Sequence, residues 1–174
     1  MLWYHHKVHK VIKKIIIVRH AKSSWSDFSL SDFERPLDQR GLNDAPVMAE
    51  VLKDAGHYPQ KIVSSSAVRA KSTASYFSTS FKIPVELVSS LYHGQPMDYL
   101  EQIVLLSEDV QCVAYFGHNP GITLLANEIQ PGVTDNIPTC GIIVAEMPQE
   151  IPWKNAKWSK MKLKHILTPK DPYP

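Results

Sequence analysis

The chain has 174 residues, of which 44% are apolar, so it is long enough for one hydrophobic core and short for two independent domains. The formal net charge is only +2 at pH 7, which is too balanced to indicate a nucleic-acid-binding surface. The two cysteines, Cys112 and Cys140, lie in apolar runs and form no CxxC pair. We therefore expect neither a disulfide framework nor a zinc site, and a reducing compartment fits this cysteine usage.

The two ends of the chain read as flanking segments of a single domain over residues 1–174. Residues 1–12 form a basic extension, and the apolar stretch that follows, residues 15–18, is far shorter than the ~7 to 15 residues of a secretory signal core. Residues 168–174 are expected to form a tail. No uncharged apolar run approaches the ~20 residues that span a bilayer. These features predict a cytoplasmic protein that binds neither membranes nor nucleic acids.

Apolar runs of strand length alternate with stretches of helical periodicity, which is typical of an α/β sandwich. The expected strands are residues 15–18, 61–64, 85–88, 112–116, 141–147 and 157–164, with the last strand at an edge of the sheet. The expected helices are residues 42–55, 67–81, 97–107 and 121–129, and residues 22–40 read as a loop.

Arginine or histidine follows three of the expected strands. Arg19 and His20 come directly after the first strand, Arg69 lies shortly after the second, and His118 follows the fourth. In an open α/β sheet, ligands bind at the carboxyl ends of the strands, where helices begin. If these strands are parallel neighbours, the four side chains converge with two helix N-termini on one pocket that suits an anion, and phosphate is its natural occupant.

The two residue types suit phosphoryl transfer. Arginine donates two hydrogen bonds to phosphate oxygens through its planar fork and stays protonated at any relevant pH. A neutral imidazole attacks phosphorus when its second nitrogen is held by an acceptor, so that the attacking nitrogen is unprotonated. Flanking arginines and a second, protonated histidine would stabilise the transferred group. The surrounding sequence contains no metal-ligand spacing, and this chemistry needs neither a metal nor a cofactor.

Four sequence blocks carry a resemblance to a known family. In chain order they are RHA with KSSW behind it, RPLDQRG, SSSAVRAKSTA and FGHNPG. Together they resemble the histidine phosphatase (phosphoglycerate mutase-like) superfamily, and specifically its SixA-like phosphohistidine phosphatase branch, over about residues 15–145. The resemblance implies a three-layer α/β sandwich with a mostly parallel central sheet and helices on both faces.

The resemblance also implies a role for each matching residue. His20 corresponds to the nucleophile, and Arg19 to its phosphate-binding neighbour. Arg69 is similar to the second arginine of the pocket, and His118 to the second histidine, on the far side of the phosphate. Arg35 is similar to an additional pocket arginine of the short branch. The implied catalytic set is therefore His20, Arg19, Arg69 and His118, and the implied phosphate pocket is Arg19, Arg35, Arg69 and His118.

Two features depart from the family pattern. Ala21 stands where the commonest motif has glycine, a change that is familiar in this branch. The mutase-like members also carry a carboxylate general acid after the block that contains Arg69, and nothing here matches it clearly. Glu86, His93 and Asp98 are available, but none has the flanking residues that would identify it. The general acid stays open, and its absence favours phosphohistidine over sugar phosphates as the substrate.

Some positions keep a structural alternative. For Arg35 the alternative is a solvated loop charge that pairs with Glu34 or Asp38. Trp153 and Trp158 are expected to cover the edge of the core rather than to anchor a partner.

The sequence thus favours a metal-independent phosphatase that acts on protein phosphohistidine through a covalent intermediate on His20. Its partner would then be a phosphorylated protein. One alternative keeps the mechanism but takes small phosphate monoesters. An alternative of another class is a phosphate-binding or scaffold domain without turnover. The oligomeric state is not determined by the sequence, although a monomer is expected.

Overall fold

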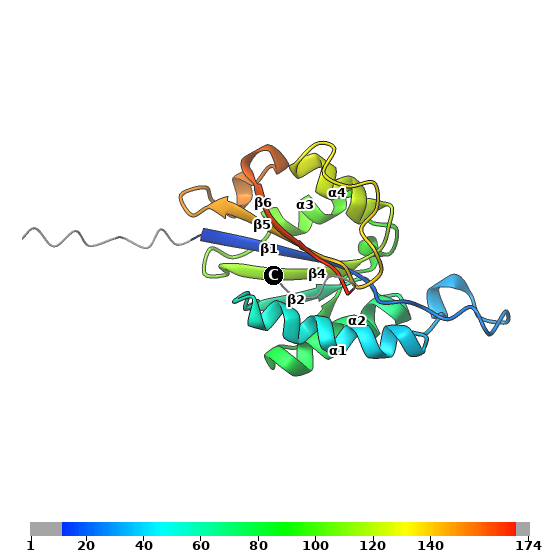
Figure 1. Cartoon of the computed structure of the whole chain (residues 1–174). Helices are drawn as coiled ribbons and strands as arrows, with labels where there is room; N and C mark the ends of the chain where they lie inside the picture. Colours follow the sequence, from blue (N-terminus) through cyan, green and yellow to red (C-terminus); the bar gives the residue numbers. More distant parts are fainter. Residues whose placement is uncertain (1–11, 170–174) are drawn as a thin grey trace, which may run out of the picture.

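In the computed structural model, which describes residues 12–169, six strands form one mixed sheet (Figure 1). The strands are β1 (Ile12–Arg19), β2 (Lys61–Ser64), β3 (Val85–Leu87), β4 (Cys112–Gly117), β5 (Ile142–Pro148) and β6 (Lys162–Leu167). Their order across the sheet is β3-β2-β4-β1-β5-β6. The first four strands in this order are parallel, and each of the last two is antiparallel to its inner neighbour. The sheet is therefore mostly parallel, as predicted.

Strand β1 lies inside the sheet because its side chains suit burial on both faces. Ile15, Ile16, Ile17 and Val18 are β-branched and fully buried. Side chains alternate along a strand, so Ile15 and Ile17 join the hydrophobic core on one face, while Ile16 and Val18 join the core on the other. The ladders to β4 and β5 satisfy both edges of the strand.

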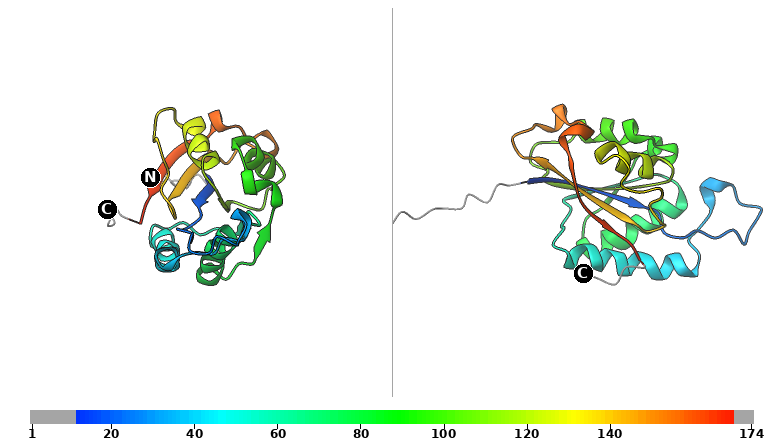
Figure 2. Two further views of the ribbon diagram at one scale, coloured as in Figure 1. Left: turned by 90° about the vertical axis from the view of Figure 1, so that its right-hand side faces the viewer. Right: turned by 45° about the horizontal axis from the view of Figure 1, so that its top comes forward.

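Helices cover both faces of the sheet and complete three layers (Figures 1 and 2). They are α1 (Gln39–Asp54), α2 (Val68–Phe81), α3 (Pro96–Val104) and α4 (Gly121–Ile129). Helices α1 and α2 pack on one face, and α3 and α4 pack on the opposite face. The fold agrees with the α/β sandwich expected from the sequence.

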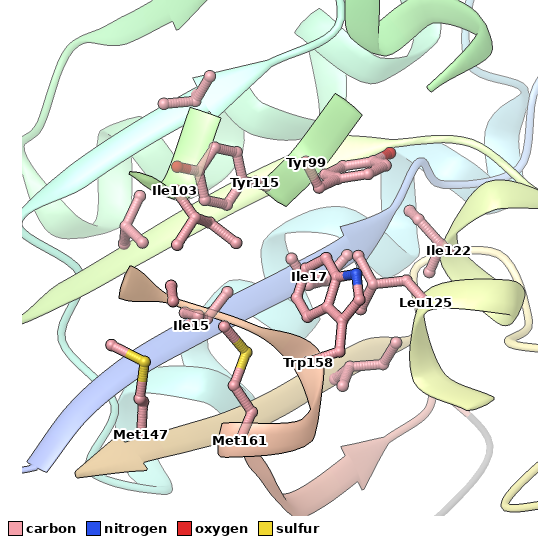
Figure 3. Close-up of a cluster of buried hydrophobic side chains, with 14 of the residues drawn as sticks. Ile15, Ile17, Tyr99, Ile103, Tyr115, Ile122, Leu125, Met147, Trp158 and Met161 are labelled. Carbon is pink, nitrogen blue, oxygen red and sulfur yellow. The ribbon is translucent and has the colours of Figure 1, made fainter. Parts of the chain in front are cut away.

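The core beneath α3 and α4 contains most of the buried aromatic side chains (Figure 3). Tyr99 and Tyr115 pack edge to face with their ring centroids 6.3 Å apart. Trp153 and Trp158 are buried in the same core. Both tryptophans thus close the core, as expected.

Several element boundaries differ from the expected ones. Helix α1 begins at Gln39 rather than at residue 42, because the Asp38 side chain caps it by accepting a 2.8 Å hydrogen bond from the backbone N–H of Gly41. Helix α3 ends at Val104, before the expected residue 107. Strand β6 begins at residue 162 instead of 157, because a short 3-10 helix (Trp158–Lys160) buries its tryptophan first.

The flanking segments are described only in part. Strand β1 begins at Ile12, the last residue of the expected N-terminal extension. Residues 1–11 of that extension and residues 170–174 of the expected tail lie outside the described residues. Among residues 12–169, no helix is long and apolar enough to cross a membrane.

Candidate active site

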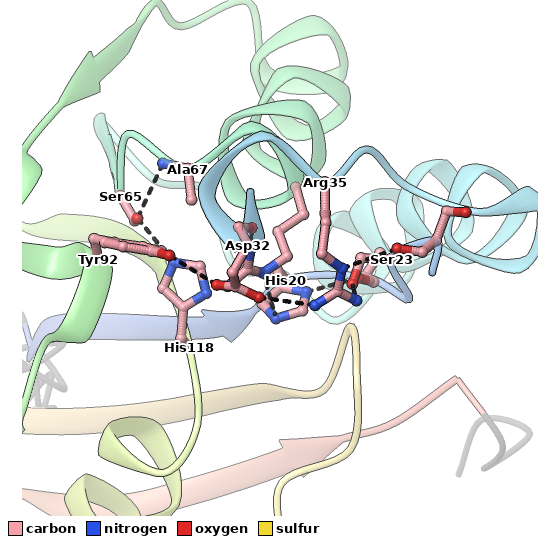
Figure 4. A network of polar contacts seen from close by, with 11 residues as sticks. His20, Ser23, Asp32, Arg35, Ser65, Ala67, Tyr92 and His118 are labelled. Carbon is pink, nitrogen blue, oxygen red and sulfur yellow. Dashed lines mark hydrogen bonds and ion pairs between the residues drawn. The ribbon is translucent and has the colours of Figure 1, made fainter. Parts of the chain in front are cut away.

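The strand ends meet at one edge of the sheet. Strand β4 lies between β1 and β2 and runs parallel to both, so the residues that follow the three strands are neighbours. The rings of His20, after β1, and His118, after β4, have their centroids 5.0 Å apart at an angle of 53° (Figure 4). Two histidines that are almost 100 positions apart in the chain therefore share one site.

His20 is held in one protonation state by its backbone. Its Nδ1 lies 2.7 Å from the carbonyl oxygen of Ala21. A carbonyl oxygen only accepts, so Nδ1 carries the proton and Nε2 has the free lone pair. Consistent with this, Nε2 accepts a 3.2 Å hydrogen bond from Nε of Arg69. Burial lowers the pKa of His20 to about 4, an effect that the hydrogen bond to Ala21 partly opposes and three nearby arginines reinforce. The ring is thus neutral at pH 7.

Arg69 connects Nε2 of His20 to Asp32 across the site. It occupies the first turn of α2 and is buried. Besides the contact with His20, its Nη1 donates to the backbone oxygen of Asp32, and its Nη2 donates to Oδ2 of Asp32 at 2.8 Å. Thr73, one turn further along α2, accepts a 3.0 Å hydrogen bond from the backbone N–H of Ala21. These contacts fix the start of α2 against the end of β1.

His118 is a neutral ring in the wall of the site. Its Nε2 lies 2.8 Å from Oγ of Ser65, and its Nδ1 is buried without a partner in the described part of the chain. Burial first, and then the neighbouring His20 and Arg69, lower the pKa of His118 to about 3. The second histidine was expected to be protonated around a transferred phosphoryl group, whereas this lowered pKa favours the neutral ring at pH 7 when no anion is bound. A neutral imidazole still offers one N–H donor to an anion.

Arg19 lies beside the other three residues rather than among them. Side chains alternate along β1, so Arg19 follows Ile17 toward the face of α4, while His20 points to the other face. Nη1 of Arg19 donates to the backbone oxygen of Ile137 at 2.6 Å and to Oδ1 of Asn136 at 3.3 Å. Its Nε is buried and has no partner among the described residues. The charge of Arg19 still lowers the pKa of His20.

Arg35 is buried at the edge of the site. Its Nε donates to the backbone oxygen of Ser24 at 2.9 Å, and its Nη2 donates to Oγ of Ser23 at 2.7 Å. Its Nη1 donates to Oδ1 of Asp32 at 2.8 Å, and its guanidinium carbon lies 3.2 Å from the ring centroid of Trp25. The guanidinium is thus fixed on every side by the segment that contains it.

The alternative partners considered for Arg35 are wrong. Glu34 is engaged by Ser31, which donates from Oγ at 2.6 Å, and Asp38 caps α1. Arg35 pairs instead with Asp32, three residues before it in the chain.

Asp32 was not identified from the sequence, although it is the anion around which the site's cations gather. Its carboxylate accepts from Arg35 and Arg69, and also from the hydroxyl of Tyr92 at 2.7 Å. Burial acts to raise the pKa of this carboxyl, but the three hydrogen bonds outweigh it, those from Tyr92 and Arg69 first, and lower the pKa to about 2. An acidic residue three positions before an arginine is too common a pattern to single it out.

A pocket of about 270 Å³ opens beside these groups. Gly121 forms part of its wall, and a Cβ there would collide with the backbone oxygen of Gly94, so the GHNPG block needs glycine at this position. His20 borders the pocket through its contacts with Arg69 and His118. The lining residues are Asp32, Arg69, Tyr92, His93, Gly94, Gln95, His118, Asn119, Pro120 and Gly121.

The three residues considered for a general acid have different surroundings. His93 lines the pocket and packs against the ring of Tyr92, with 4.1 Å between the ring centroids. Glu86 pairs with Lys61 at 2.9 Å, and Asp98 accepts a 2.7 Å hydrogen bond from the backbone of Gln95 at the start of α3. Neither carboxylate lines the pocket. Within residues 12–169, no group of three or more His, Cys, Asp or Glu side chains gathers in a way that suits a metal ion.

Comparison with known proteins relates part of the chain to a known family. Residues 15–93 match the model of the histidine phosphatase superfamily (branch 1). An uncharacterised chloroplast protein of Arabidopsis thaliana is 31% identical over 141 residues, which cover 75% of this chain and 64% of that protein. The chain thus spans slightly less than two thirds of the length of this relative.

Solved structures agree over nearly the whole fold. A candidate SixA phosphohistidine phosphatase of Agrobacterium tumefaciens superimposes with a TM-score of 0.77 at 24% identity, over 90% of this chain and 97% of that one. The protein histidine phosphatase SixA in complex with tungstate gives a TM-score of 0.75 at 22% identity, over 90% and 97% of the two chains. The family match contains His20, Arg35 and Arg69, and the fold extends the similarity past His118. Residues 15–93 thus match the histidine phosphatase superfamily (branch 1), and the fold of the chain is similar to that of the SixA structures.

Proposed function

We propose that the protein is a phosphatase that hydrolyses phosphohistidine on proteins through a covalent phosphoryl group on Nε2 of His20. The observation that carries this proposal is the 2.7 Å contact between Nδ1 of His20 and the carbonyl oxygen of Ala21. It fixes the proton on Nδ1 and leaves an unprotonated nitrogen beside Arg69, which is the arrangement that an imidazole nucleophile needs.

The reaction then takes two in-line steps. In the first step the Nε2 lone pair forms a bond to phosphorus, the bond between phosphorus and the substrate imidazole breaks, and its electron pair leaves with that imidazole. In the second step a water oxygen bonds to phosphorus, and the bond to Nε2 breaks with its electron pair returning to His20. The water proton passes to the solvent, and inorganic phosphate is released.

The buried cations would stabilise the transferred group. Arg69 already reaches Nε2 of His20, so its remaining N–H donors lie next to a phosphoryl group carried there. Nε of Arg19 and Nδ1 of His118 are buried and unpaired among the described residues, so each has capacity for a phosphate oxygen. A bound phosphate dianion would raise the pKa of His118 from its low value and strengthen this contact.

The surroundings of Asp32 favour phosphohistidine over phosphate esters. Among the described residues it is the carboxylate that lines the pocket, and its pKa of about 2 keeps it ionised at pH 7, so it has no proton to give. An ester leaves as an alkoxide that needs a proton from an acid. Phosphohistidine needs none when its second ring nitrogen is protonated, because the imidazole then leaves as a neutral molecule. The fold similarity to a protein histidine phosphatase that binds tungstate, a tetrahedral oxyanion, supports the same substrate.

The test compares two substrates with the purified protein in EDTA. We expect a phosphohistidine peptide to be hydrolysed with a higher kcat/KM than β-glycerophosphate, whose alkoxide leaving group needs a proton, with the His20→Ala variant as the blank. A faster reaction with the ester would indicate a phosphatase of small monoesters. If the protein hydrolyses neither substrate but binds vanadate, it is a phosphate-binding domain without turnover.

A further inference from the structure

The segment that connects β1 to α1 extends beyond the carboxyl edge of the sheet. This projecting loop, residues 22–38, stands away from the layered body at the right of Figure 1 and at the right of the second view in Figure 2. A bridge between Ser23 and Leu37 closes its base. Three aromatic side chains of the loop are exposed, Trp25 by 63%, Phe28 by 92% and Phe33 by 37%.

Polar contacts hold much of the loop in place. Asp27 accepts hydrogen bonds from the backbone and the hydroxyl of Ser29, at 2.9 and 2.6 Å. Arg35 ties the base of the loop together. In the described part of the chain, neither hydrophobic core includes any of the three exposed aromatics. Phe33 packs on Tyr92 and Trp25 stacks on Arg35, whereas Phe28 is 92% exposed and belongs to neither core. Aromatic side chains exposed on a surface are typical of a binding site.

The aromatic surface is continuous with the phosphate pocket. Phe33 packs edge to face against Tyr92, with ring centroids 5.0 Å apart, and Tyr92 lines the pocket. At the other side, Trp25 stacks on Arg35. A molecule whose phosphoryl group enters the pocket therefore lies close to Phe33.

The size and charge of this surface select the kind of partner. A small phosphate compound is accommodated in the pocket of about 270 Å³, and neither Trp25 nor Phe28 belongs to the pocket lining. A molecule that fills the pocket would have to extend beyond it to contact these two side chains, as a macromolecule does. The carboxylates of Asp27 and Glu34 lie on the same loop and are exposed, so they favour basic side chains in the partner.

We propose that the projecting loop docks the phosphohistidine-bearing protein, by contact of Phe28 and Trp25 with an apolar patch beside the phosphohistidine and of Asp27 and Glu34 with basic residues around that patch. This inference rests on the proposed function and assigns its protein substrate a second contact outside the pocket. In this inference Phe28 raises the affinity for the protein substrate and takes no part in the chemical step.

The test uses Phe28→Ser, because Phe28 is the most exposed of the three aromatics and does not line the pocket. Proteins in an extract of the cells that produce this protein are labelled with radioactive ATP, and loss of their acid-labile label is followed. Phosphoramidate serves as the small substrate. We expect kcat/KM for the labelled proteins to fall about 10-fold, which is typical of losing one aromatic anchor, with hydrolysis of phosphoramidate unchanged.

Two control variants sharpen the result. Leu105→Ser removes an apolar side chain that is 79% exposed after the end of α3, away from the pocket, and should react with both substrates as the wild type does. Phe28→Tyr keeps the aromatic ring and should retain most of the rate with labelled proteins.

The remaining outcomes overturn the inference in distinct ways. If Phe28→Ser clears the labelled proteins as fast as the wild type, the loop is not a docking surface, although the proposed function stands. A change from dimer to monomer in Phe28→Ser would show that the loop contacts a second copy of the chain instead. If the wild type hydrolyses phosphoramidate but leaves the protein label intact, its substrate is a small molecule. A wild type that is inactive on both substrates refutes the proposed function itself.

Discussion

The carboxyl ends of β1, β2 and β4 and the projecting loop supply side chains to the same site by different physical means. At the strand ends, backbone ladders fix the position of each residue, and alternation along the strand fixes the face to which it points. In the loop, the positions of Asp32 and Arg35 depend on hydrogen bonds among polar side chains and backbone oxygens. The sheet thus places the groups proposed for chemistry. The loop holds the guanidinium of Arg69 through the carboxylate of Asp32, which carries the opposite charge.

This difference implies a ranking of substitutions. Removing a strand-end group that contacts the phosphoryl group affects the chemical step directly, whereas removing a loop group acts through Arg69. We therefore expect the largest effects at the strand ends and smaller ones in the loop.

The largest effect is expected for His20→Ala. Without the nucleophile no covalent intermediate forms, so kcat for a phosphohistidine peptide should fall by about 10³-fold or more. His57→Ala is the matched control, because His57 is also a buried histidine with a pKa lowered to about 4 by burial, but it pairs with Lys14 outside the site. Retention of more than about one hundredth of the rate in His20→Ala would contradict the assignment.

Arg69→Ala should lose about 10²-fold or more in kcat, because one charged donor to the transferred group is removed. Arg69→Lys should recover little of this loss, since a single ammonium cannot reach both Nε2 of His20 and the two oxygens of Asp32 that Arg69 holds. Lys71→Ala, an exposed cation in the same helix, serves as the control for a change in net charge. Normal turnover by Arg69→Ala would remove this residue from the site.

A smaller effect is expected in the loop. Asp32→Asn keeps the shape of the side chain but removes the charge that pairs with Arg35 and Arg69, so kcat/KM should fall about 10-fold through loss of Arg69 positioning. Asp109→Asn is the matched control, because Asp109 is an exposed carboxylate outside both the loop and the pocket lining. Equal rates for the two variants would show that Asp32 does not position Arg69.

The last prediction concerns the free energy of unfolding, which should depend on pH through His20 and His118. The folded-state pKa values of about 4 for His20 and about 3 for His118 lie below the unfolded value near 6.5, so the unfolded chain binds more protons between about pH 4 and 6.5. Stability should therefore rise with pH across this window, by up to about 2 kcal/mol for each ring between pH 5 and 7. Urea unfolding at both pH values measures this rise, and it should be smaller in His118→Asn. An unchanged pH dependence in that variant would contradict the lowered pKa.

The same contrast explains how much the sequence could predict. The burial of residues 15–18 and the positions of His20 and His118 follow from patterns that depend on local periodicity, and the structure agrees. Arg19 was expected in one pocket with the other three residues, and the structure places it beside them, with Nη1 on the carbonyl oxygen of Ile137 and Nε unpaired among the described residues. Whether the second histidine is charged depends on its burial, which no local pattern reports.

The loop was much less predictable. Residues 22–40 have no periodicity, so the partner of Arg35 was sought among its neighbours, Glu34 and Asp38, and the true partner is Asp32. The position of Asp32 depends on Arg69 and on Tyr92, which lie 37 and 60 positions further along the chain. Such long-range contacts follow only from the folded arrangement.

The central claim is that Nε2 of His20 carries the phosphoryl group. The most direct measurement is to trap the intermediate by rapid quenching at alkaline pH after mixing with a phosphohistidine peptide, and to locate the phosphoryl group by tandem mass spectrometry and ³¹P NMR. The account predicts phosphorylation of His20 at Nε2, because Nδ1 donates to the carbonyl oxygen of Ala21. Phosphorylation at Nδ1 or on His118, or turnover without any phosphorylated histidine, would contradict it.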